Sequence, residues 1–169
     1  MSNSAGTSVV NWLRKYGFIL LIIAGVGYWF MKYKIVHEVV WSEHQFEINE
    51  GVRVSAAEAL RTPCIVHFYA TWCGPCVAEL PELAKYQKEN PQVRIYLVTD
   101  DSWDKIEQVK STYEMLILRV DDMDDLNVHT IPTTYFLNAS GKEEEAIQGA
   151  CEWGDPAFRK QINPIVQTN

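Results

Sequence analysis

The sequence predicts an α/β domain, with helices flanking a central β-sheet, that follows one N-terminal transmembrane helix. Short apolar runs alternate with amphipathic segments, which is typical of strands and helices around one core. The apolar run at 65–70 leads directly into Cys73-Gly74-Pro75-Cys76 and then into a helix-like segment. An uncharged apolar run at 16–31 lies outside this pattern. We therefore expect a short tail at 1–15, a transmembrane signal-anchor at 16–34, a linker at 35–44 and the folded domain at 45–169.

The N-terminal apolar run is the candidate membrane anchor. It carries no charge between Lys15 and Lys32, and aromatic residues mark both of its ends, as in an interfacial belt. About twenty residues are available for a span if these two lysines reach the headgroups. A cleaved signal peptide is one alternative, although Ala24-Gly25-Val26 fits an A-x-A-like cleavage site poorly. A soluble helix is the other, and the flanking basic residues are too balanced to set an orientation.

The charge of the chain changes after the apolar run. All 22 acidic residues lie after Lys34, and with the 11 basic residues there they give that part a formal net charge of −11. Nucleic-acid binding needs a basic surface, so this balance argues against a nucleic-acid partner. A soluble acidic surface is the interpretation that the composition favours.

Turn and cap signals delimit the elements of the domain. Residues 45–55 alternate weakly around a central Gly, which predicts a small hairpin. Ser55 and Glu58 have the spacing of a capping box, so a short helix through Leu60 should follow. Asp155 is the expected N-cap of the last helix. The other expected elements are a buried strand at 65–70, a helix at 75–90, a strand at 93–99, a helix at 102–113, a strand at 115–120, a helical turn at 121–126, strands at 133–137 and 142–148, and a helix at 155–162.

Cys73 and Cys76 are the residues most suited to chemistry. Their spacing can close a small disulfide ring, and Cys73 stands where the strand ends and the helix begins. The free N–H groups and the positive end of a helix favour a thiolate at that position. Because a thiolate is the attacking species in disulfide exchange, we expect Cys73 to be an exposed attacking thiol and Cys76 the resolving thiol. An inert structural disulfide is the alternative.

A zinc site is a further alternative for a C-x-x-C motif. Tetrahedral zinc needs two more Cys or His ligands, usually as a second close pair. The remaining Cys and His residues are scattered along the chain, at His37, His44, Cys64, His67, His129 and Cys151. We therefore expect no metal and no other cofactor.

Two motifs resemble the thioredoxin fold. Ala70-Thr71-Trp72-Cys73-Gly74-Pro75-Cys76 is similar to its active site, and Val77-Ala78-Glu79-Leu80-Pro81 continues it as in the TlpA-like branch, which includes the ResA and DsbE type proteins. The segment from Thr130 to Asn138 resembles the cis-proline loop and the strand after it. The likeness covers roughly 46–166. It implies a thioredoxin-like domain with a mixed sheet.

The resemblance also implies a docking site around the two cysteines. Pro132 would be the cis-proline that faces the active-site disulfide, with neighbouring backbone that pairs with an extended substrate strand. The alternative for Ile131, just before it, is plain core packing. The residues expected at the active site and docking patch are Trp72, Gly74, Pro75, Ile131, Pro132 and Gly149.

His67 departs from the family pattern. In thioredoxins the matching position usually carries a buried Asp that assists proton transfer to the resolving Cys, and many TlpA-like members carry an Asn. A neutral His67 would accept the proton of Cys76, whereas a protonated one would favour the thiolate. Glu79 matches the acidic residue of the TlpA-like motif and is the second residue expected to tune the thiol pKa values. The alternatives are a buried His with a local hydrogen bond and a solvated Glu.

The other two cysteines are expected to be free. Cys64 begins the central strand at the end opposite the active site, while Cys151 follows Gly149, which the resemblance places near it. A strand length would separate the two sulfur atoms, beyond the reach of a disulfide. We expect Cys64 to be buried, and Cys151 is a candidate redox accessory.

These observations predict a membrane-anchored protein thiol–disulfide oxidoreductase. The Gly-Pro dipeptide between the thiols is that of thioredoxin, a reductant at about −270 mV, so we expect a reductase. The resemblance implies extracytoplasmic protein clients, such as apocytochrome c haem-site cysteines in cytochrome c maturation, and a membrane electron donor of the DsbD kind. It also implies a single-pass protein of the inner (cytoplasmic) membrane whose redox domain faces the periplasm or its equivalent. The alternatives are a disulfide oxidase or isomerase and a non-catalytic binding module.

Overall fold

A seven-stranded sheet forms the centre of the computed structural model of this protein, which describes residues 15–17, 19, 21–26, 39 and 41–167. The strands are β1 (Gln45–Asn49), β2 (Val52–Ser55), β3 (Cys64–Phe68), β4 (Arg94–Thr99), β5 (Leu116–Arg119), β6 (Thr133–Leu137) and β7 (Glu143–Gln148). Their order across the sheet is β2-β1-β5-β4-β3-β6-β7. Strands β3, β4 and β5 are parallel, and the other pairs are antiparallel. The central mixed sheet is therefore confirmed.

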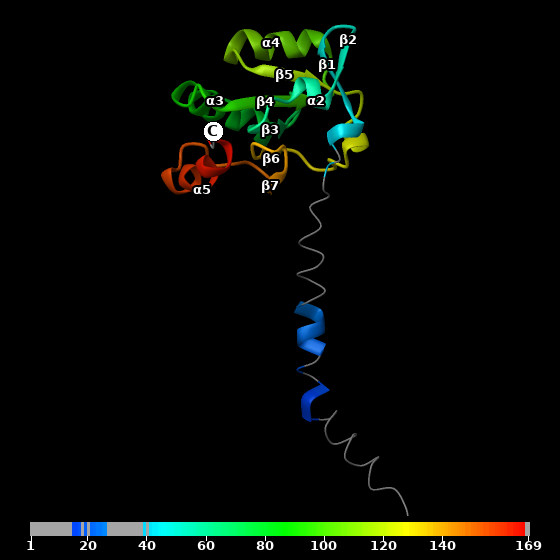
Figure 1. The fold of residues 1–169 in the computed structure, drawn as a ribbon, viewed down its shortest axis with the longest axis vertical. Helices are drawn as coiled ribbons and strands as arrows, with labels where there is room; N and C mark the ends of the chain where they lie inside the picture. Colours follow the sequence, from blue (N-terminus) through cyan, green and yellow to red (C-terminus); the bar gives the residue numbers. More distant parts are fainter. Residues whose placement is uncertain (1–14, 18, 20, 27–38, 40, 168–169) are drawn as a thin grey trace, which may run out of the picture. The chain divides into compact units, whose positions relative to one another are not determined.

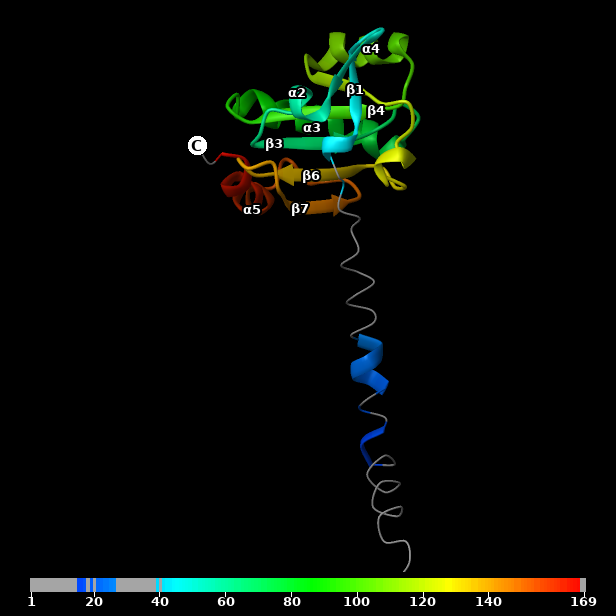
Figure 2. The ribbon, with the colours of Figure 1, turned by 45° about the vertical axis from the view of Figure 1, so that its right-hand side comes forward.

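Three long helices cover one face of this sheet, namely α3 (Gly74–Glu89), α4 (Trp103–Tyr113) and α5 (Pro156–Val166). α3 joins β3 to β4, and α4 joins β4 to β5, so both connections step across the sheet in the same direction. Because connections between parallel strands are right-handed, both helices lie on the same face of the sheet. α5 reaches that face too, because the Tyr86 hydroxyl of α3 donates to Asn163 Oδ1 at 2.6 Å. Figures 1 and 2 show α4, α3 and α5 following one another in the order of the strands that they cover.

Short elements complete the domain, namely η1 (Trp41–Glu43), α2 (Ala56–Ala59) and η2 (Asp124–Leu126). The Trp41 ring of η1 lies 6.2 Å from the Phe68 ring and meets Tyr135 edge-on at 5.5 Å. Side chains alternate along β3, so Phe68 and this aromatic cluster lie on the face away from α3. α2 packs beside η1 and begins with the expected capping box.

The boundaries of most elements agree with the sequence patterns, but the last helix is longer than expected. It was expected at 155–162 and continues to Val166, with Pro164 in its final turn. Ile162 and Val166 lie one turn apart and are both buried. Their packing against the core keeps the final turn helical, which outweighs the low helix propensity of proline.

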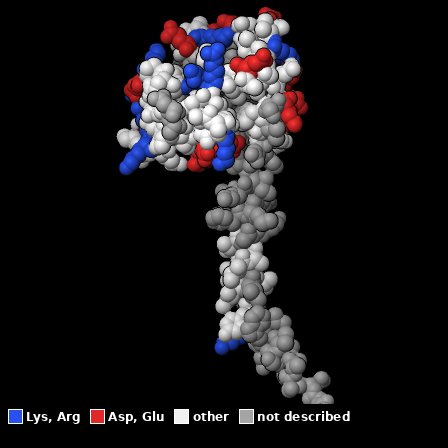
Figure 3. Space-filling view, in the orientation of Figure 1, with Lys and Arg blue, Asp and Glu red and all other residues white. Residues whose placement is uncertain are grey.

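The surface of the domain mixes both signs of charge. On the face shown in Figure 3, Lys and Arg side chains are interspersed with Asp and Glu side chains. This pattern, on a domain with an acidic balance, differs from the continuous basic face by which nucleic-acid-binding domains are recognised.

The chain divides into two compact units, Met1–Val36 and His37–Asn169. The second unit contains the sheet and all of the elements named above. The expected tail at 1–15 lies outside the described residues except for position 15, and the expected linker at 35–44 is described at 39 and 41–44, where η1 lies, so both boundaries stay predictions.

The expected membrane span at 16–34 is described only in part. Positions 16, 17, 19 and 21–26 are helical, whereas 18, 20 and 27–34 lie outside the described residues. Leu21 and Ile23 are 72% and 62% exposed. Within the described part of the chain, no helix combines the length and the apolar character that crossing a membrane requires.

Candidate active site

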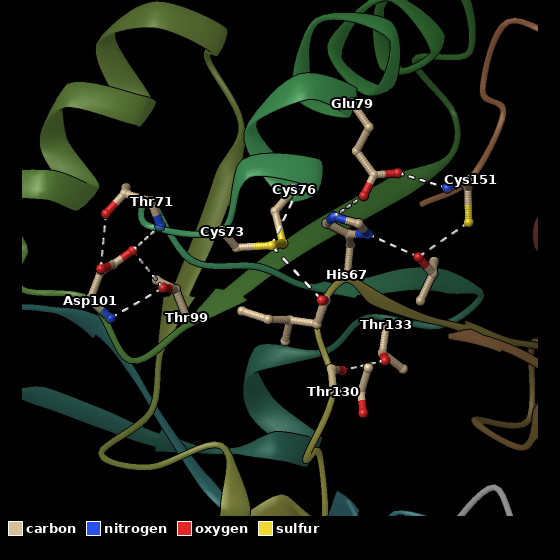
Figure 4. The surroundings of a disulfide bond; sticks show 12 residues. His67, Thr71, Cys73, Cys76, Glu79, Thr99, Asp101, Thr130, Thr133 and Cys151 are labelled. Atoms are coloured by element: carbon tan, nitrogen blue, oxygen red, sulfur yellow. Dashed lines mark hydrogen bonds and ion pairs between the residues drawn. A yellow bond between two sulfur atoms is a disulfide. The ribbon is translucent and has the colours of Figure 1, made fainter. Parts of the chain in front are cut away.

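The disulfide lies where β3 leads into α3 (Figure 4). Cys73 is the N-cap of α3, and Pro75 stands in the first turn of that helix. Cys73 and Cys76 are bonded, with their Cα atoms 5.3 Å apart. The Cys76 N–H donates to Cys73 Sγ at 3.3 Å. After reduction, the same N–H group and the positive end of α3 would stabilise a thiolate on Cys73.

Neither cysteine of the pair is widely accessible. Cys73 is 6% exposed and Cys76 is fully buried. Cys73 was expected to be exposed, and it is instead nearly buried, because the Ile131 carbonyl oxygen lies 3.8 Å from its sulfur and covers it. The neighbouring Trp72, by contrast, is 70% exposed. Cys73 is still the more accessible of the two cysteines.

The loop before β6 faces the disulfide. Its Ile131–Pro132 peptide bond is cis, as the resemblance implies, and Ile131 is half-buried and not part of the core. The Gly149 N–H donates to the Pro132 carbonyl at 2.7 Å, and Gly149 has a φ of +98°, which side chains disfavour. Of the expected docking residues, Ile131 contacts Cys73 and Gly149 is bonded to the adjacent Pro132, while Trp72, Gly74 and Pro75 are exposed next to Cys73 in the chain.

A buried His–Glu pair joins β3 to α3. His67 has no exposed surface, and Glu79, one turn after Cys76 on the buried face of α3, is 7% exposed. His67 Nε2 and Glu79 Oε1 lie 3.4 Å apart, and neither atom has a hydrogen-bond partner. The solvated alternative for Glu79 is therefore wrong. Burial raises the pKa of Glu79 and lowers the pKa of His67 to about 3.

Hydrogen bonds extend this pair toward β6 and the segment after β7. His67 Nδ1 lies 2.9 Å from Thr134 Oγ1, which lies 3.5 Å from Cys151 Sγ. Glu79 Oε2 accepts the Cys151 N–H at 2.9 Å and the Trp153 indole N–H at 3.0 Å. The sequence interpretation missed Thr134 and Trp153. Thr134 could have been found, because antiparallel pairing of two predicted strands places it opposite His67.

A second buried carboxylate, Asp101, holds the loop before the disulfide and was also missed. It follows β4 and accepts two hydrogen bonds from Thr71, from N–H at 2.7 Å and from Oγ1 at 3.0 Å. The Thr99 hydroxyl donates to it at 3.1 Å, and Lys105 Nζ lies 3.5 Å away. Asp101 thereby fixes the backbone two residues before Cys73. The available signal was the pair of acidic residues, Asp100 and Asp101, that follows a buried parallel strand.

The other two cysteines are free, as expected, and both are buried, which was expected of Cys64 alone. Cys64 begins β3, and burial raises the pKa of its thiol to about 12. Burial raises the pKa of Cys151 to about 11, so this thiol is protonated at neutral pH. Low exposure and a protonated sulfur offer no support for oxidation of Cys151. Among the described residues, no group of three or more His, Cys, Asp or Glu side chains is placed to hold a metal ion.

Known proteins share this architecture. The family described as "Thioredoxin" matches residues 53–155. The thiol:disulfide interchange protein DsbE of Pseudomonas aeruginosa is 26% identical over 120 residues, which cover 68% of this chain and 66% of DsbE. The thiol-disulfide oxidoreductase ResA of Oceanobacillus iheyensis is 30% identical over 95 residues, which cover 51% of this chain and 49% of ResA.

A solved structure, that of MTB dsbF in mixed oxidised and reduced forms, is similar with a TM-score of 0.61. Its sequence identity is 16%, and the match covers 75% of this chain and 97% of that chain, which shows a shared fold. The family match contains both cysteines of the disulfide and the cis-proline Pro132. The chain therefore belongs to the thioredoxin family, in its group of thiol–disulfide oxidoreductases of the DsbE and ResA type.

Proposed function

We propose that this chain reduces disulfides of extracytoplasmic client proteins while anchored in a membrane. The observation that carries the proposal is the Cys73–Cys76 pair at the start of α3, opposite the cis-Pro132 loop. The Gly-Pro dipeptide between the thiols favours reduction, since thioredoxin is a reductant at about −270 mV.

The reaction begins with the dithiol form. The Cys73 thiolate attacks one sulfur of a client disulfide, so a Cys73–client bond forms and the client bond breaks. The second client sulfur leaves as a thiolate and takes up a proton from water. The Cys76 N–H and the positive end of α3 stabilise the attacking thiolate.

The second step releases the client. Cys76 gives its proton to the Glu79 carboxylate, which lies one turn along the same buried helix face. The Cys76 thiolate then attacks Cys73 Sγ, the Cys73–Cys76 bond forms, and the client sulfur leaves. Two electrons have passed from the pair to the client.

His67 acts on this step in its neutral form. Its depressed pKa means that the ring is uncharged at neutral pH, so the protonated alternative is not favoured. A neutral imidazole 3.4 Å from Glu79 can donate to the carboxylate or accept from the carboxyl group. We therefore assign proton acceptance to the pair of His67 and Glu79.

The client would bind at the loop that faces the disulfide. The half-buried Ile131 and the exposed Trp72 offer apolar contacts on either side of Cys73. Backbone next to Pro132 would pair with an extended client segment, as the resemblance implies. Trp72 is suited to such contact, because large aromatic side chains are frequent anchors in interfaces.

The remaining parts of the proposal concern place and partners. The exposed apolar side chains at the described positions between 16 and 26 suit a lipid environment, which supports a single-pass anchor in the inner membrane. The redox domain would face the periplasm or its equivalent. Clients in cytochrome c maturation and a donor of the DsbD kind follow from the family resemblance.

Insulin reduction with dithiothreitol tests the activity in the full-length protein. The wild type should accelerate it, Cys73→Ser should not, and Cys76→Ser should accumulate a mixed disulfide that survives on a non-reducing gel. Cys64→Ser is the matched control and should remain active. No acceleration by the wild type would favour the binding module.

The reduction potential of the Cys73–Cys76 pair tests the direction of electron flow. A value near about −270 mV supports a reductase, whereas one between about −180 and −120 mV would make the protein an oxidase or isomerase.

A further inference from the structure

A closed ring of polar contacts includes the Glu79 carboxyl group (Figure 4): three of its links are hydrogen bonds, and the fourth is the close approach of Glu79 to His67. It runs from Glu79 Oε1 to His67 Nε2 at 3.4 Å, and from His67 Nδ1 to Thr134 Oγ1 at 2.9 Å. It continues from Thr134 Oγ1 to Cys151 Sγ at 3.5 Å and returns from the Cys151 N–H to Glu79 Oε2 at 2.9 Å. All four residues are buried, so each polar atom depends on its neighbour in the ring.

When Glu79 is ionised, the side-chain hydrogen-bond donors around the ring all point in one direction, toward Glu79 Oε1. The neutral His67 must carry its proton on Nε2, because a bare nitrogen facing the carboxylate would be repelled. Nδ1 is then an acceptor, and the Thr134 hydroxyl donates to it. The Thr134 oxygen accepts from the S–H group of Cys151.

The direction reverses when Glu79 is protonated on Oε1. The carboxyl group donates to His67 Nε2, so the ring proton of His67 must move to Nδ1. Nδ1–H then donates to the Thr134 oxygen, and the Thr134 hydroxyl must donate elsewhere. The acceptor within reach is Cys151 Sγ.

We propose that Thr134 and Cys151 are positioning residues that let His67 change tautomer each time Glu79 gains or loses its proton. This inference rests on the proposed function of Glu79 as the proton acceptor of Cys76. A thiol suits the position next to Thr134 because it can both donate and accept a hydrogen bond. The Thr134 hydroxyl is therefore satisfied whether Glu79 is ionised or protonated. Cys151 therefore serves the reaction without being oxidised.

Groups from the neighbouring elements border the ring. The Trp153 indole N–H donates to Glu79 Oε2 and can do so in both states. From α5, Arg159 donates to the Trp153 carbonyl and pairs with Glu89 at 2.5 Å. Cys76, one turn before Glu79, is the group with which the ring exchanges its proton.

The tautomer change can be measured directly by NMR. In the reduced, isotope-labelled full-length protein, the ring nitrogens of His67 and the side-chain carboxyl carbon of Glu79 are followed through the titration of Glu79. We expect the ring proton to move from Nε2 to Nδ1 as Glu79 becomes protonated. A single tautomer throughout the titration would overturn the proposal.

Variants of Cys151 test its part in the ring. Cys151→Ala leaves the Thr134 hydroxyl without an acceptor only when Glu79 is protonated, so the pKa of Glu79 should fall by about one unit. Cys151→Ser should restore the pKa. Cys64→Ala removes another buried thiol, outside the ring, and should leave it unchanged. Equal shifts in Cys151→Ala and Cys64→Ala would contradict the proposal.

A double variant shows whether the effect passes through Thr134. In a Thr134→Val background, Cys151→Ala should produce no further shift in the pKa of Glu79, because the hydroxyl that it leaves unpaired is gone. A shift in the pKa of Glu79 as large as that of Cys151→Ala alone would overturn the proposal. The pKa and tautomer measurements do not depend on enzymatic activity. If insulin reduction failed while the tautomer change was observed, the proposed function would be overturned and the role of Thr134 and Cys151 would stand.

Discussion

Two buried carboxylates lie near the disulfide, and their surroundings differ. Asp101 accepts hydrogen bonds from Thr71 and Thr99 on both of its oxygens. Glu79 accepts two N–H groups on Oε2, while its Oε1 faces only the nitrogen of His67. Both oxygens of Asp101 therefore have hydrogen-bond donors, whereas Glu79 has one oxygen that can hold a proton.

The difference separates a positioning role from a titrating role. Hydrogen bonds to both oxygens of Asp101 hold the loop at Thr71 in place. Burial with one unpaired oxygen favours a proton instead, and burial raises the pKa of Glu79. Two buried carboxyl groups thus have different roles, because Asp101 positions a loop and Glu79 can gain and lose a proton.

The largest expected effect is a loss of stability in Asp101→Ala. The change leaves the Thr71 N–H and the Thr71 and Thr99 hydroxyls without their acceptor, so the free energy of unfolding should fall by about 3 kcal/mol. Urea denaturation measures it. Asp125→Ala, at an exposed position, is the control and should match the wild type. An equal loss in Glu79→Gln would break the comparison, because the Gln oxygen can still accept from Cys151 and Trp153.

The second effect is kinetic and belongs to Glu79. Glu79→Gln removes the proton acceptor of Cys76, and such groups contribute typically 100-fold or more, so release of the mixed disulfide should slow by about 100-fold. Stopped-flow tryptophan fluorescence after mixing with a client disulfide would measure that step. The pKa values of Cys73 and Cys76 should also shift in Glu79→Gln and His67→Ala. Unchanged thiol titration curves in both variants would remove the assigned role.

Local pattern accounts for what the sequence could predict. The strands and helices follow from apolar periodicity and cap signals, and Cys73, Cys76 and Pro132 follow from short motifs. Asp101 and Thr134 act through partners about 30 and 67 residues away, so their roles depend on loop geometry and strand register. The low exposure of Cys73 likewise depends on a loop that is distant in sequence.

The third effect is a pH dependence in which two slopes oppose each other. The folded-state pKa of His67 lies near 3, below its ordinary 6.5. The contribution of His67 to stability is therefore fully present above pH 6.5 and is lost as the pH falls toward 3. The pKa of Glu79 is raised above 4.5, so its contribution is complete below 4.5 and is lost as the pH rises through the folded-state value. Each slope is at most about 1.4 kcal/mol per pH unit.

Single variants should separate these two slopes. Glu79→Gln should make stability rise more steeply with pH between 4.5 and 6.5, and His67→Asn should make it fall above 4.5. Urea denaturation at a series of pH values gives both slopes. Profiles parallel to the wild type in both variants would mean that neither group titrates differently on folding.

The smallest expected effect concerns the ion pair of Asp101. Lys105 Nζ lies 3.5 Å from Asp101 Oδ1, but the lysine side chain is 46% exposed, so water and salt screen the attraction. Lys105→Met should lower the free energy of unfolding by less than about 0.5 kcal/mol, and less still in high salt. Urea denaturation at two salt concentrations measures it. A loss comparable to that of Asp101→Ala would show that charge pairing, not the donors of Thr71 and Thr99, fixes this carboxylate, and the contrast with Glu79 would then need a different cause.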